Sequence, residues 1–295
     1  MDKGESSCSS CGKESICSAK GQKPEESPEQ YQQRMEIERR LCRIQNKILV
    51  MSGKGGVGKS STAVNLSIAL MQEENAVGLL DVDIHGPSVP KMLGLDNHRP
   101  VAAEEGMIPA NYLGLRTMSI GFMLENPSDA LIWRGPVKAG VIQQMIVDVD
   151  WGYLDYLVVD CPPGTGDEPL TVAQFLGEVN GAVIVTTPQD VALLDVSKSI
   201  TFCRQLGIPI LGIIENMSGF VCPKCGEVVD IFKSGGGEKL AAEMNVPFLG
   251  RIPVDGAMVE SGDAGKPYII AHPDTETAEA FRSVARGIIA AAKAK

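Results

Sequence analysis

The 295-residue sequence lacks any uninterrupted apolar run that approaches the roughly 20 residues of a membrane-spanning helix. Its first residues, MDKGESSCSS, lack the apolar core of a secretory signal peptide. Basic residues are also scarce, since 27 Lys and Arg stand against 37 Asp and Glu and the formal charge is −10. A phosphate backbone is bound by clustered basic side chains, so this balance argues against a general nucleic-acid binder. We therefore expect a cytoplasmic protein with no membrane or nucleic-acid partner.

Apolar residues nevertheless make up 44% of the chain, which is ordinary for a globular protein with a sizeable core. Apolar runs typical of buried strands alternate with helical segments along most of the sequence. The expected strands span 48–51, 76–81, 115–120, 153–160, 181–187, 210–216 and 248–252, and the expected helices 62–74, 137–149, 192–206, 235–244 and 275–292. Such alternation predicts an α/β fold with a doubly wound, mostly parallel sheet. Residues 86–112 are rich in proline and glycine and are expected to be irregular.

A phosphate-binding loop stands near the start of this pattern. The stretch ILVMSGKGGVGKSS, residues 48–61, indicates a buried strand, a glycine-rich turn and the start of a helix. It contains G-x-x-x-x-G-K-[ST], in which backbone N–H groups and a helix N-terminus surround an anion. We expect Lys59 to reach the β- and γ-phosphates of ATP and Ser60 to bind Mg²⁺. The residues expected to contact ATP are Gly53, Lys54, Gly55, Gly56, Val57, Gly58, Lys59, Ser60 and Ser61.

Three aspartates stand at the ends of predicted strands. Asp81 and Asp83 end the strand 76–81, where two carboxylates near a phosphate site suit Mg²⁺ and water. We expect Asp81 to accept from a Mg²⁺-bound water and Asp83 to hold the attacking water; alternatively, either one caps the following loop. Asp160 ends the apolar strand 153–160, the Walker-B pattern that is typical of an aspartate on the magnesium side.

Two further residues are assigned to the nucleotide from their places near strand ends. Asn216 lies at the carboxyl end of the strand 210–216, where open α/β sheets bind ligands. Its amide suits an adenine edge, and a turn residue that closes the strand is the alternative. Pro253 directly follows the strand 248–252 and is expected to line the same ATP site.

The eight cysteines, in a reducing compartment, are expected to be metal ligands or buried residues rather than disulfides. Cys222 and Cys225 form the C-x₂-C of CPKCG, in which Pro and Gly bend the backbone so that both sulfurs face one atom. Two thiolates are half of a closed site, and a two-fold symmetric dimer would supply four. Four thiolates suit either Zn²⁺ or a [4Fe–4S] cluster, and a redox C-x₂-C is the third possibility.

The segment 1–30 is polar and is expected to be a flexible tail, because it cannot bury enough apolar surface to fold alone. Residues 31–46 are expected to be a helical connector, and 47–295 the ATPase domain that includes the C-x₂-C. Clustered thiols in C-x₂-C-x₅-C spacing suggest a soft metal or an Fe–S cluster in the tail, with incidental or redox thiols as the alternative. These tail cysteines are Cys8, Cys11 and Cys17.

The loop sequence KGGVGKS resembles the deviant P-loop of the group that contains MinD, ParA and the nitrogenase iron protein. That resemblance implies a dimer that closes on ATP, with Lys54 reaching the nucleotide of the partner subunit. From about Asn46 onward, the chain is similar to the Mrp/ApbC family of P-loop ATPases that carry Fe–S clusters. The motifs that carry this likeness are GKGGVGKSS, LLDVDIHGPSVP, WRGP, VVDCPPGTGDEPL, VTTPQDVALLD and ENMSGFVCPKCG.

The Mrp/ApbC resemblance implies a homodimer that hydrolyses ATP and holds a [4Fe–4S] cluster on Cys222 and Cys225 of each subunit. Delivery of the cluster to apo-proteins, and contact with cluster-assembly proteins, are implied in the same way. The expected catalytic residues are Lys54, Lys59 and Asp83. The tail is similar to the N-terminal cluster motif of the eukaryotic cytosolic scaffold branch, which has a fourth cysteine upstream; here none precedes Cys8. Two other functions stay open: a positioning ATPase like MinD or ParA, and a nucleotide-gated electron-transfer protein like the nitrogenase iron protein.

Overall fold

The computed structural model describes residues 27–104, 106–124, 133, 135–222 and 224–293. Its strands are β1 (Ile44–Met51), β2 (Val77–Asp81), β3 (Val101–Ala103), β4 (Gly106–Ile108), β5 (Ala110–Tyr112), β6 (Leu115–Ser119), β7 (Leu154–Asp160), β8 (Gly181–Thr186), β9 (Ile210–Val221), β10 (Val228–Val229) and β11 (Phe248–Val254). Its helices are α1 (Pro28–Leu41), α2 (Lys59–Gln72), α3 (Val89–Met92), α4 (Gly135–Val147), α5 (Asp167–Leu176), α6 (Asp190–Gln205), α7 (Gly236–Glu243), α8 (Gly256–Asp263), α9 (Tyr268–Ala271) and α10 (Glu276–Lys293), with a 3₁₀ turn η1 (Ile120–Met123).

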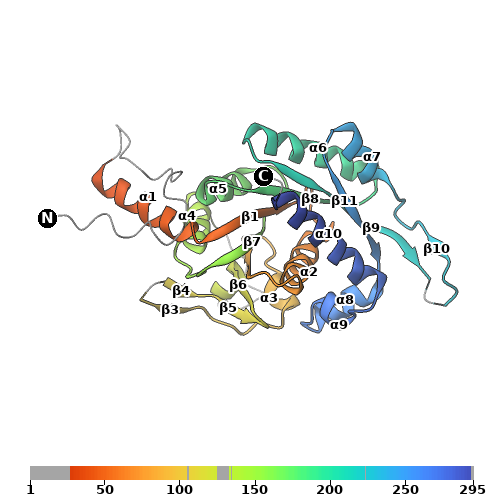
Figure 1. Ribbon diagram of the computed structural model, residues 1–295, viewed down its shortest axis with the longest axis horizontal. Helices are drawn as coiled ribbons and strands as arrows, with labels where there is room; N and C mark the ends of the chain where they lie inside the picture. The colour runs from red at the N-terminus through yellow and green to blue at the C-terminus, as the bar shows by residue number, and fades with distance from the viewer. Residues whose placement is uncertain (1–26, 105, 125–132, 134, 223, 294–295) are drawn as a thin grey trace.

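Among the described residues, the principal sheet comprises nine strands: eight follow the order β10-β9-β8-β1-β7-β2-β6-β5, and β11 pairs with β9. The ladders that run from β11 through β9, β8, β1, β7 and β2 to β6 are all parallel. Antiparallel pairing occurs where β10 meets β9 and where β5 meets β6. Helices cover both faces of the sheet (Figure 1), which confirms the predicted doubly wound, mostly parallel α/β fold.

The central strands are buried on both faces, which is why their sequences are continuously apolar rather than alternating. In β1, Ile48 and Val50 join the core that α2 and α10 cover. Leu49 and Met51 point to the other face and join the core that α4 and α5 cover. A third, smaller cluster packs α6 and α7 against β8 and β9. This two-sided burial fixes the carboxyl ends of the strands, where the predicted site residues stand.

β1 begins at Ile44, earlier than the strand predicted from the apolar run, and α1 ends at Leu41. The prediction of a helical connector over 31–46 is therefore wrong in its last residues, which already belong to the sheet. Lys47 is buried inside the strand because its ammonium donates to the Leu176 carbonyl at 2.8 Å. The polar Lys47 of this strand is thus bonded to a residue far away in the sequence. The pattern of neighbouring apolar residues could therefore not predict that the strand begins before Ile48.

The segment 86–112, predicted to be irregular, contains short regular elements instead. α3 follows β2, β3 and β4 form a separate hairpin, and β5 adds an antiparallel edge to β6. Strands of three residues carry too little pattern to be distinguished from loops in a sequence. Within the described residues, no helix combines the length and the apolar character needed to cross a membrane.

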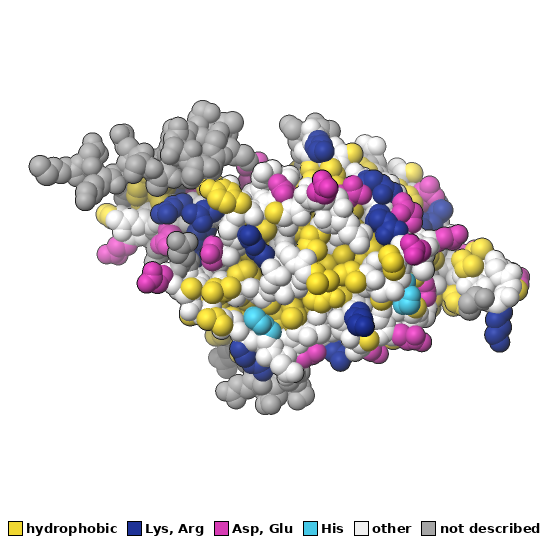
Figure 2. All heavy atoms as spheres, turned by 60° about the horizontal axis from the view of Figure 1, so that its bottom comes forward, with side chains coloured by type: hydrophobic (Ala, Val, Ile, Leu, Met, Phe, Trp, Pro, Cys, Tyr) yellow, Lys and Arg dark blue, Asp and Glu magenta, His cyan; other side chains and the backbone are white. Residues whose placement is uncertain are grey.

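β9 is twelve residues long and continues past β8, whose last paired residue, Thr186, lies opposite Glu215. Its far end pairs with β10, and the resulting hairpin projects from the domain (Figure 1). Residues 217–229 are called the arm below. In the space-filling view the arm is a separate lobe at the right edge that displays hydrophobic side chains (Figure 2). The exposed hydrophobic residues of the arm include Val221 and Val228. The C-x₂-C lies at the tip of this arm.

Candidate functional site

The P-loop joins β1 to α2 through two glycines, Gly56 and Gly58, that each have a φ of +79°. A Cβ at position 58 would lie 2.2 Å from Asn216 Nδ2, so the loop packs directly on that side chain. A Cβ at Gly53 would lie 2.4 Å from the carbonyl carbon of Asp195 on α6. Glycine is therefore required by conformation and close approach at position 58, and by close approach alone at position 53.

Lys59 begins α2 with its ammonium among carboxylates. Its Nζ lies 2.6 Å from Asp160 Oδ1 and 3.4 Å from Asp83 Oδ2, and the Lys59 side chain is only 6% exposed. Burial on its own lowers the pKa of Lys59, but the negative charges of Asp160 and Asp83 outweigh it and the pKa is raised. The lysine is therefore a permanent cation in the mouth of the P-loop, as phosphate binding requires.

Asp81 and Asp160 are direct neighbours on β2 and β7. Burial, reinforced by the charge of Asp160, raises the pKa of Asp81 to about 7, even though Ser119 Oγ donates to its carboxylate at 2.7 Å. Burial also raises the pKa of Asp160, and the charge of Lys59 offsets only part of that effect. Asp160 Oδ2 is buried without a hydrogen-bond partner in the described part of the chain. Asp160 also forms a side-chain hydrogen bond with Ser60, so its unpartnered oxygen lies near the predicted magnesium ligand. This arrangement fits Mg²⁺, which binds one or two carboxylates together with phosphates and water.

A cleft opens over the P-loop, and most of the residues predicted to contact ATP line it. The predicted residues that line it are Lys54, Gly55, Gly56, Gly58, Lys59, Ser60, Ser61 and Asp83. Ser52, Gly86, Ser88, Met92 and Pro163 also line the cleft, and sequence reasoning did not assign them. Gly86, Ser88 and Met92 lie in the segment after β2, and Pro163 lies in the segment after β7. Both strands end in aspartate, and this position could have indicated that the segments after them line the cleft.

Asn216 lies against the P-loop, as its strand-end position predicts, but the protein already uses its amide. Nδ2 donates to the Val57 carbonyl at 2.9 Å, and the residue is buried. This bond makes Asn216 a support of the loop, a role that the sequence did not predict. An amide has a second N–H and an acceptor oxygen, so the adenine contact remains a prediction. Pro253 follows Ile252, which pairs with Asn216, and its contact with ATP is likewise still a prediction.

The tip of the arm has the form of a metal knuckle, called the knuckle below (residues 222–226). The Gly226 N–H donates to the Cys222 carbonyl at 2.8 Å, and Gly226 has a φ of +73°, which favours glycine. Backbone N–H groups of Lys224 and Cys225 hydrogen-bond to Cys222 and lower the pKa of its thiol. Because the thiolate is the form that binds metal, this turn suits a metal ligand pair. In the part of the chain that the structure describes, no third His, Cys, Asp or Glu joins a group able to hold a metal.

Five of the six other cysteines divide into two sets, and the sixth, Cys42, is half-buried just after α1. The tail cysteines lie outside the described residues, so their metal binding remains a prediction. Cys161 and Cys203 are fully buried; burial raises the pKa of Cys161, and it raises that of Cys203 to about 11. These two thiols are protonated at neutral pH and serve as core residues.

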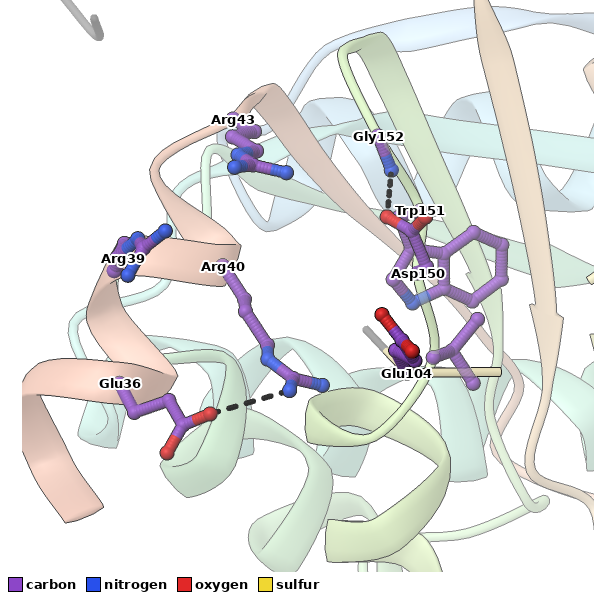
Figure 3. Close-up of a pocket in the computed structure, with 9 residues that line it drawn as sticks. Glu36, Arg39, Arg40, Arg43, Glu104, Asp150, Trp151 and Gly152 are labelled. Carbon is purple, nitrogen blue, oxygen red and sulfur yellow. Dashed lines mark hydrogen bonds and ion pairs between the residues drawn. The ribbon is translucent and has the colours of Figure 1, made fainter. Parts of the chain in front are cut away.

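A second hollow lies at the opposite edge of the sheet, between the end of α1 and the segment before β7 (Figure 3). Its charged lining residues are Glu36, Arg39, Arg40, Arg43, Glu104 and Asp150. Arg40 is held in place by the Glu36 carboxylate at 3.2 Å and the Val147 carbonyl at 2.9 Å. Cationic and anionic side chains are balanced here and none of the predicted site residues is present, so the P-loop cleft is the candidate functional site.

The likeness of the chain to known proteins agrees with this site. Residues 43–289 match the family described as NUBPL iron-transfer P-loop NTPase. The chain belongs to this family. The iron-sulfur cluster carrier protein of Methanocaldococcus jannaschii is 49% identical to the chain over 279 residues, covering 94% of this chain and 96% of that protein. The cytosolic Fe-S cluster assembly factor Nubp2 homolog of Anopheles gambiae is 50% identical over 251 residues, covering 83% and 97%.

Solved structures of nucleotide-binding proteins resemble this NUBPL-family chain in fold. A nucleotide-binding protein from Archaeoglobus fulgidus, in complex with ADP, superposes with a TM-score of 0.73 at 39% identity, covering 84% of this chain and 96% of that one. The cell division ATPase MinD of Pyrococcus furiosus superposes with a TM-score of 0.61 at 23% identity, over 83% and 99%. The second likeness concerns the fold alone, and it confirms that the chain has the predicted MinD/ParA-type fold.

Proposed function

We propose that this protein binds and hydrolyses ATP and carries a [4Fe–4S] cluster on Cys222 and Cys225, which it passes to apo-proteins in the cytoplasm. The observation that carries the proposal is the knuckle itself. Two thiols, one exposed and one half-buried with a lowered pKa, stand at the tip of an arm that projects from a P-loop domain. The names of the Methanocaldococcus and Anopheles relatives support a carrier over a positioning ATPase or an electron-transfer protein.

The knuckle supplies two of the four thiolates that a [4Fe–4S] cluster uses. A second copy of the chain, related by a two-fold axis, would supply the other two and make a homodimer with the cluster between the arms. Transfer then needs only ligand exchange. Each iron–sulfur bond to the arm is replaced by a bond to a cysteine of the acceptor, the released thiolate keeps its electron pair, and no electron changes hands. Loading from cluster-assembly proteins is the same exchange in reverse.

The nucleotide site acts through residues that are already in place. Lys59 turns from Asp160 to the phosphates, and the N–H groups of the glycine loop surround them. Ser60 and Asp160, with Asp81 through water, would hold Mg²⁺, which when bound neutralises phosphate charge. Asp83 lines the cleft and is the carboxylate that positions the attacking water and accepts its proton. Lys54 lines the same cleft and would reach the nucleotide of the partner subunit.

The test is anaerobic reconstitution with iron and sulfide, followed by metal analysis and sedimentation. The tail cysteines are replaced by serine throughout, so that iron reports only the knuckle. We expect one [4Fe–4S] cluster for every two chains, lost in Cys222→Ser with ATP binding retained. Cys42→Ser, which changes a half-buried cysteine outside the arm, is the matched control and should keep the cluster.

Two results would contradict the proposal. Zinc at the knuckle under iron-replete anaerobic conditions would indicate a structural site. A reconstituted monomer with a complete cluster would exclude the bridging arrangement.

A further inference from the structure

Two adjacent residues at the end of β9 connect the nucleotide loop to the base of the arm. Glu215 is the last residue of β9 that pairs with β8, and beyond it β9 pairs only with β11 and β10. Asn216 donates to the Val57 carbonyl and fills the space beside Gly58. The Met217 methyl would lie 3.7 Å from a Cβ at Gly58, so it too faces the loop. The P-loop therefore packs on the residues from which the arm begins.

β9 does not run straight into the arm. Between Asn216 and Phe220 it carries two more residues than the facing stretch of β11, which makes a bulge. Met217 and Gly219, inside the bulge, have φ values of +56° and +76°. Met217 is a non-glycine residue in the left-handed region, a conformation that surrounding contacts must impose. Because a bulge bends a strand and redirects the chain beyond it, its geometry sets the direction of the knuckle cysteines.

A single buried carboxylate fixes the other side of the bulge. Glu215 Oε1 accepts from Ser218 Oγ at 2.6 Å, inside the bulge, and from the Gly235 N–H at 2.8 Å. Glu215 Oε2 accepts from the Gly237 N–H, and Arg251 Nε lies 3.5 Å from Oε1. Gly235 and Gly237 belong to the chain that returns from the arm into α7. Glu215, which is fully buried, thus ties the outgoing and the returning chain of the arm together.

We propose that the bulge at Asn216–Gly219 transmits the occupancy of the P-loop to the arm, with Glu215 and Ser218 as positioning residues. The inference rests on the proposed function and adds the route by which the nucleotide acts on the metal site. A nucleotide that shifts the Val57 carbonyl displaces Asn216 at the start of the bulge. The Ser218–Glu215 bond holds the far side, so the shift reorients the arm instead of being absorbed. By linkage, nucleotide and metal must then change each other's affinity by the same factor.

The test measures Co²⁺ binding at the knuckle, from thiolate-to-cobalt absorbance, with and without saturating ADP. The parent is the full-length chain with the tail cysteines replaced by serine, and Cys222→Ser identifies the signal. We expect ADP to change the Co²⁺ dissociation constant of the parent by about five-fold or more. Ser218→Ala, which removes the contacts of Ser218 Oγ with Glu215 and Ser234, should reduce this factor to below about two while ADP affinity is retained. Ser218→Thr keeps the hydroxyl and should keep the coupling.

A second variant tests the bulge without changing Ser218, and a second measurement tests it without a metal. Met217→Gly leaves every hydrogen bond in place but removes the restriction on the bulge, and it should also weaken the coupling. Amide hydrogen exchange over 217–222 in metal-free protein should respond to ADP in the parent and in Ser218→Thr, but not in Ser218→Ala.

The outcomes separate this inference from the proposed function. A parent that binds both ligands without coupling, or a Ser218→Ala variant that couples as the parent does, would overturn the inference alone. A Co²⁺ signal that does not depend on Cys222 would overturn the metal site instead. In that case the hydrogen-exchange comparison still decides whether ADP reaches the arm through the bulge.

Discussion

Substitution of Lys59 by methionine should destabilise the nucleotide-free protein, and the loss should depend on pH. Methionine keeps the length of the side chain and removes its charge. Lys59 Nζ lies 2.6 Å from the fully buried Asp160 carboxylate, so the variant leaves that carboxylate without its closest cation. Removal of one partner of a buried ion pair costs about 3–5 kcal/mol. We expect about 3 kcal/mol at pH 8, because uptake of a proton by Asp160 offsets part of the cost.

The sign of the pH dependence follows from the direction of the carboxyl pKa. Burial raises the pKa of Asp160 in the folded protein, and loss of Lys59 raises it further. The penalty relative to wild type is therefore full above the folded pKa of Asp160 in the variant, shrinks as the pH falls through it, and vanishes below the folded pKa that Asp160 has in the wild type. Below the folded pKa, each pH unit returns about 1.4 kcal/mol of the penalty. The variant should come closer to wild type at pH 6 than at pH 8.

Urea unfolding of nucleotide-free, chelator-treated protein at the two pH values measures this difference. Asp160→Asn combined with Lys59→Met removes both charges, and the double variant should be more stable at pH 8 than Lys59→Met alone. A free energy of unfolding for Lys59→Met within about 0.5 kcal/mol of the wild-type value at pH 8 would refute the reasoning, because a buried unpaired carboxylate should destabilise the protein by more than that.

Three further outcomes are expected. Asp83→Asn should retain ATP binding but slow phosphate release about 100-fold or more, because an amide cannot accept the proton of the attacking water; unchanged turnover would leave Asp83 as a loop cap. Gly58→Ala should lower the free energy of unfolding by about 1 kcal/mol or more, given its φ of +79° and the close Asn216 amide, whereas Gly55→Ala faces open space and should be nearly neutral in the same urea assay. Replacement of the tail cysteines by serine should lower iron per chain without changing ATP turnover, and equal iron in both proteins would show that the tail binds none.

The P-loop and the aspartate-ending strands could be predicted because their signals are contiguous in the sequence. Glycines, a lysine and a serine in fixed order after a strand predict a phosphate-binding loop. Asp160 ends an apolar run, and parallel strands place their carboxyl ends at one edge of the sheet, beside the cradle. The knuckle could be predicted for the same reason, since its two cysteines and its glycine lie within five residues.

The contacts that position these residues could not be predicted, because they join distant parts of the chain. Ser119 ends β6 and donates to Asp81 on β2, and nothing around it in the sequence marks it. The Asn216 bond to Val57 spans 159 residues. Glu215 stands next to the predicted Asn216, yet a buried glutamate at the end of an apolar strand gives no local sign of three hydrogen-bond donors that arrive from the arm and α7.

The charges around Lys59 also determine how the nucleotide must enter. A phosphate that draws Lys59 away leaves Asp160 buried without its cation. Nucleotide without Mg²⁺ therefore forms a contact with Lys59 only by breaking the ion pair between Lys59 and Asp160. Asp160 Oδ2, which has no partner among the described residues, is where a divalent cation would compensate this loss. Nucleotide and Mg²⁺ are therefore expected to bind cooperatively. In Asp160→Asn the carboxylate charge is absent and Lys59 keeps only its contact with Asp83 at 3.4 Å, so ADP affinity should become much less dependent on Mg²⁺ in titrations with and without chelator. If that variant keeps the full magnesium dependence of the wild type, the exchange of Lys59 between Asp160 and phosphate does not control nucleotide entry.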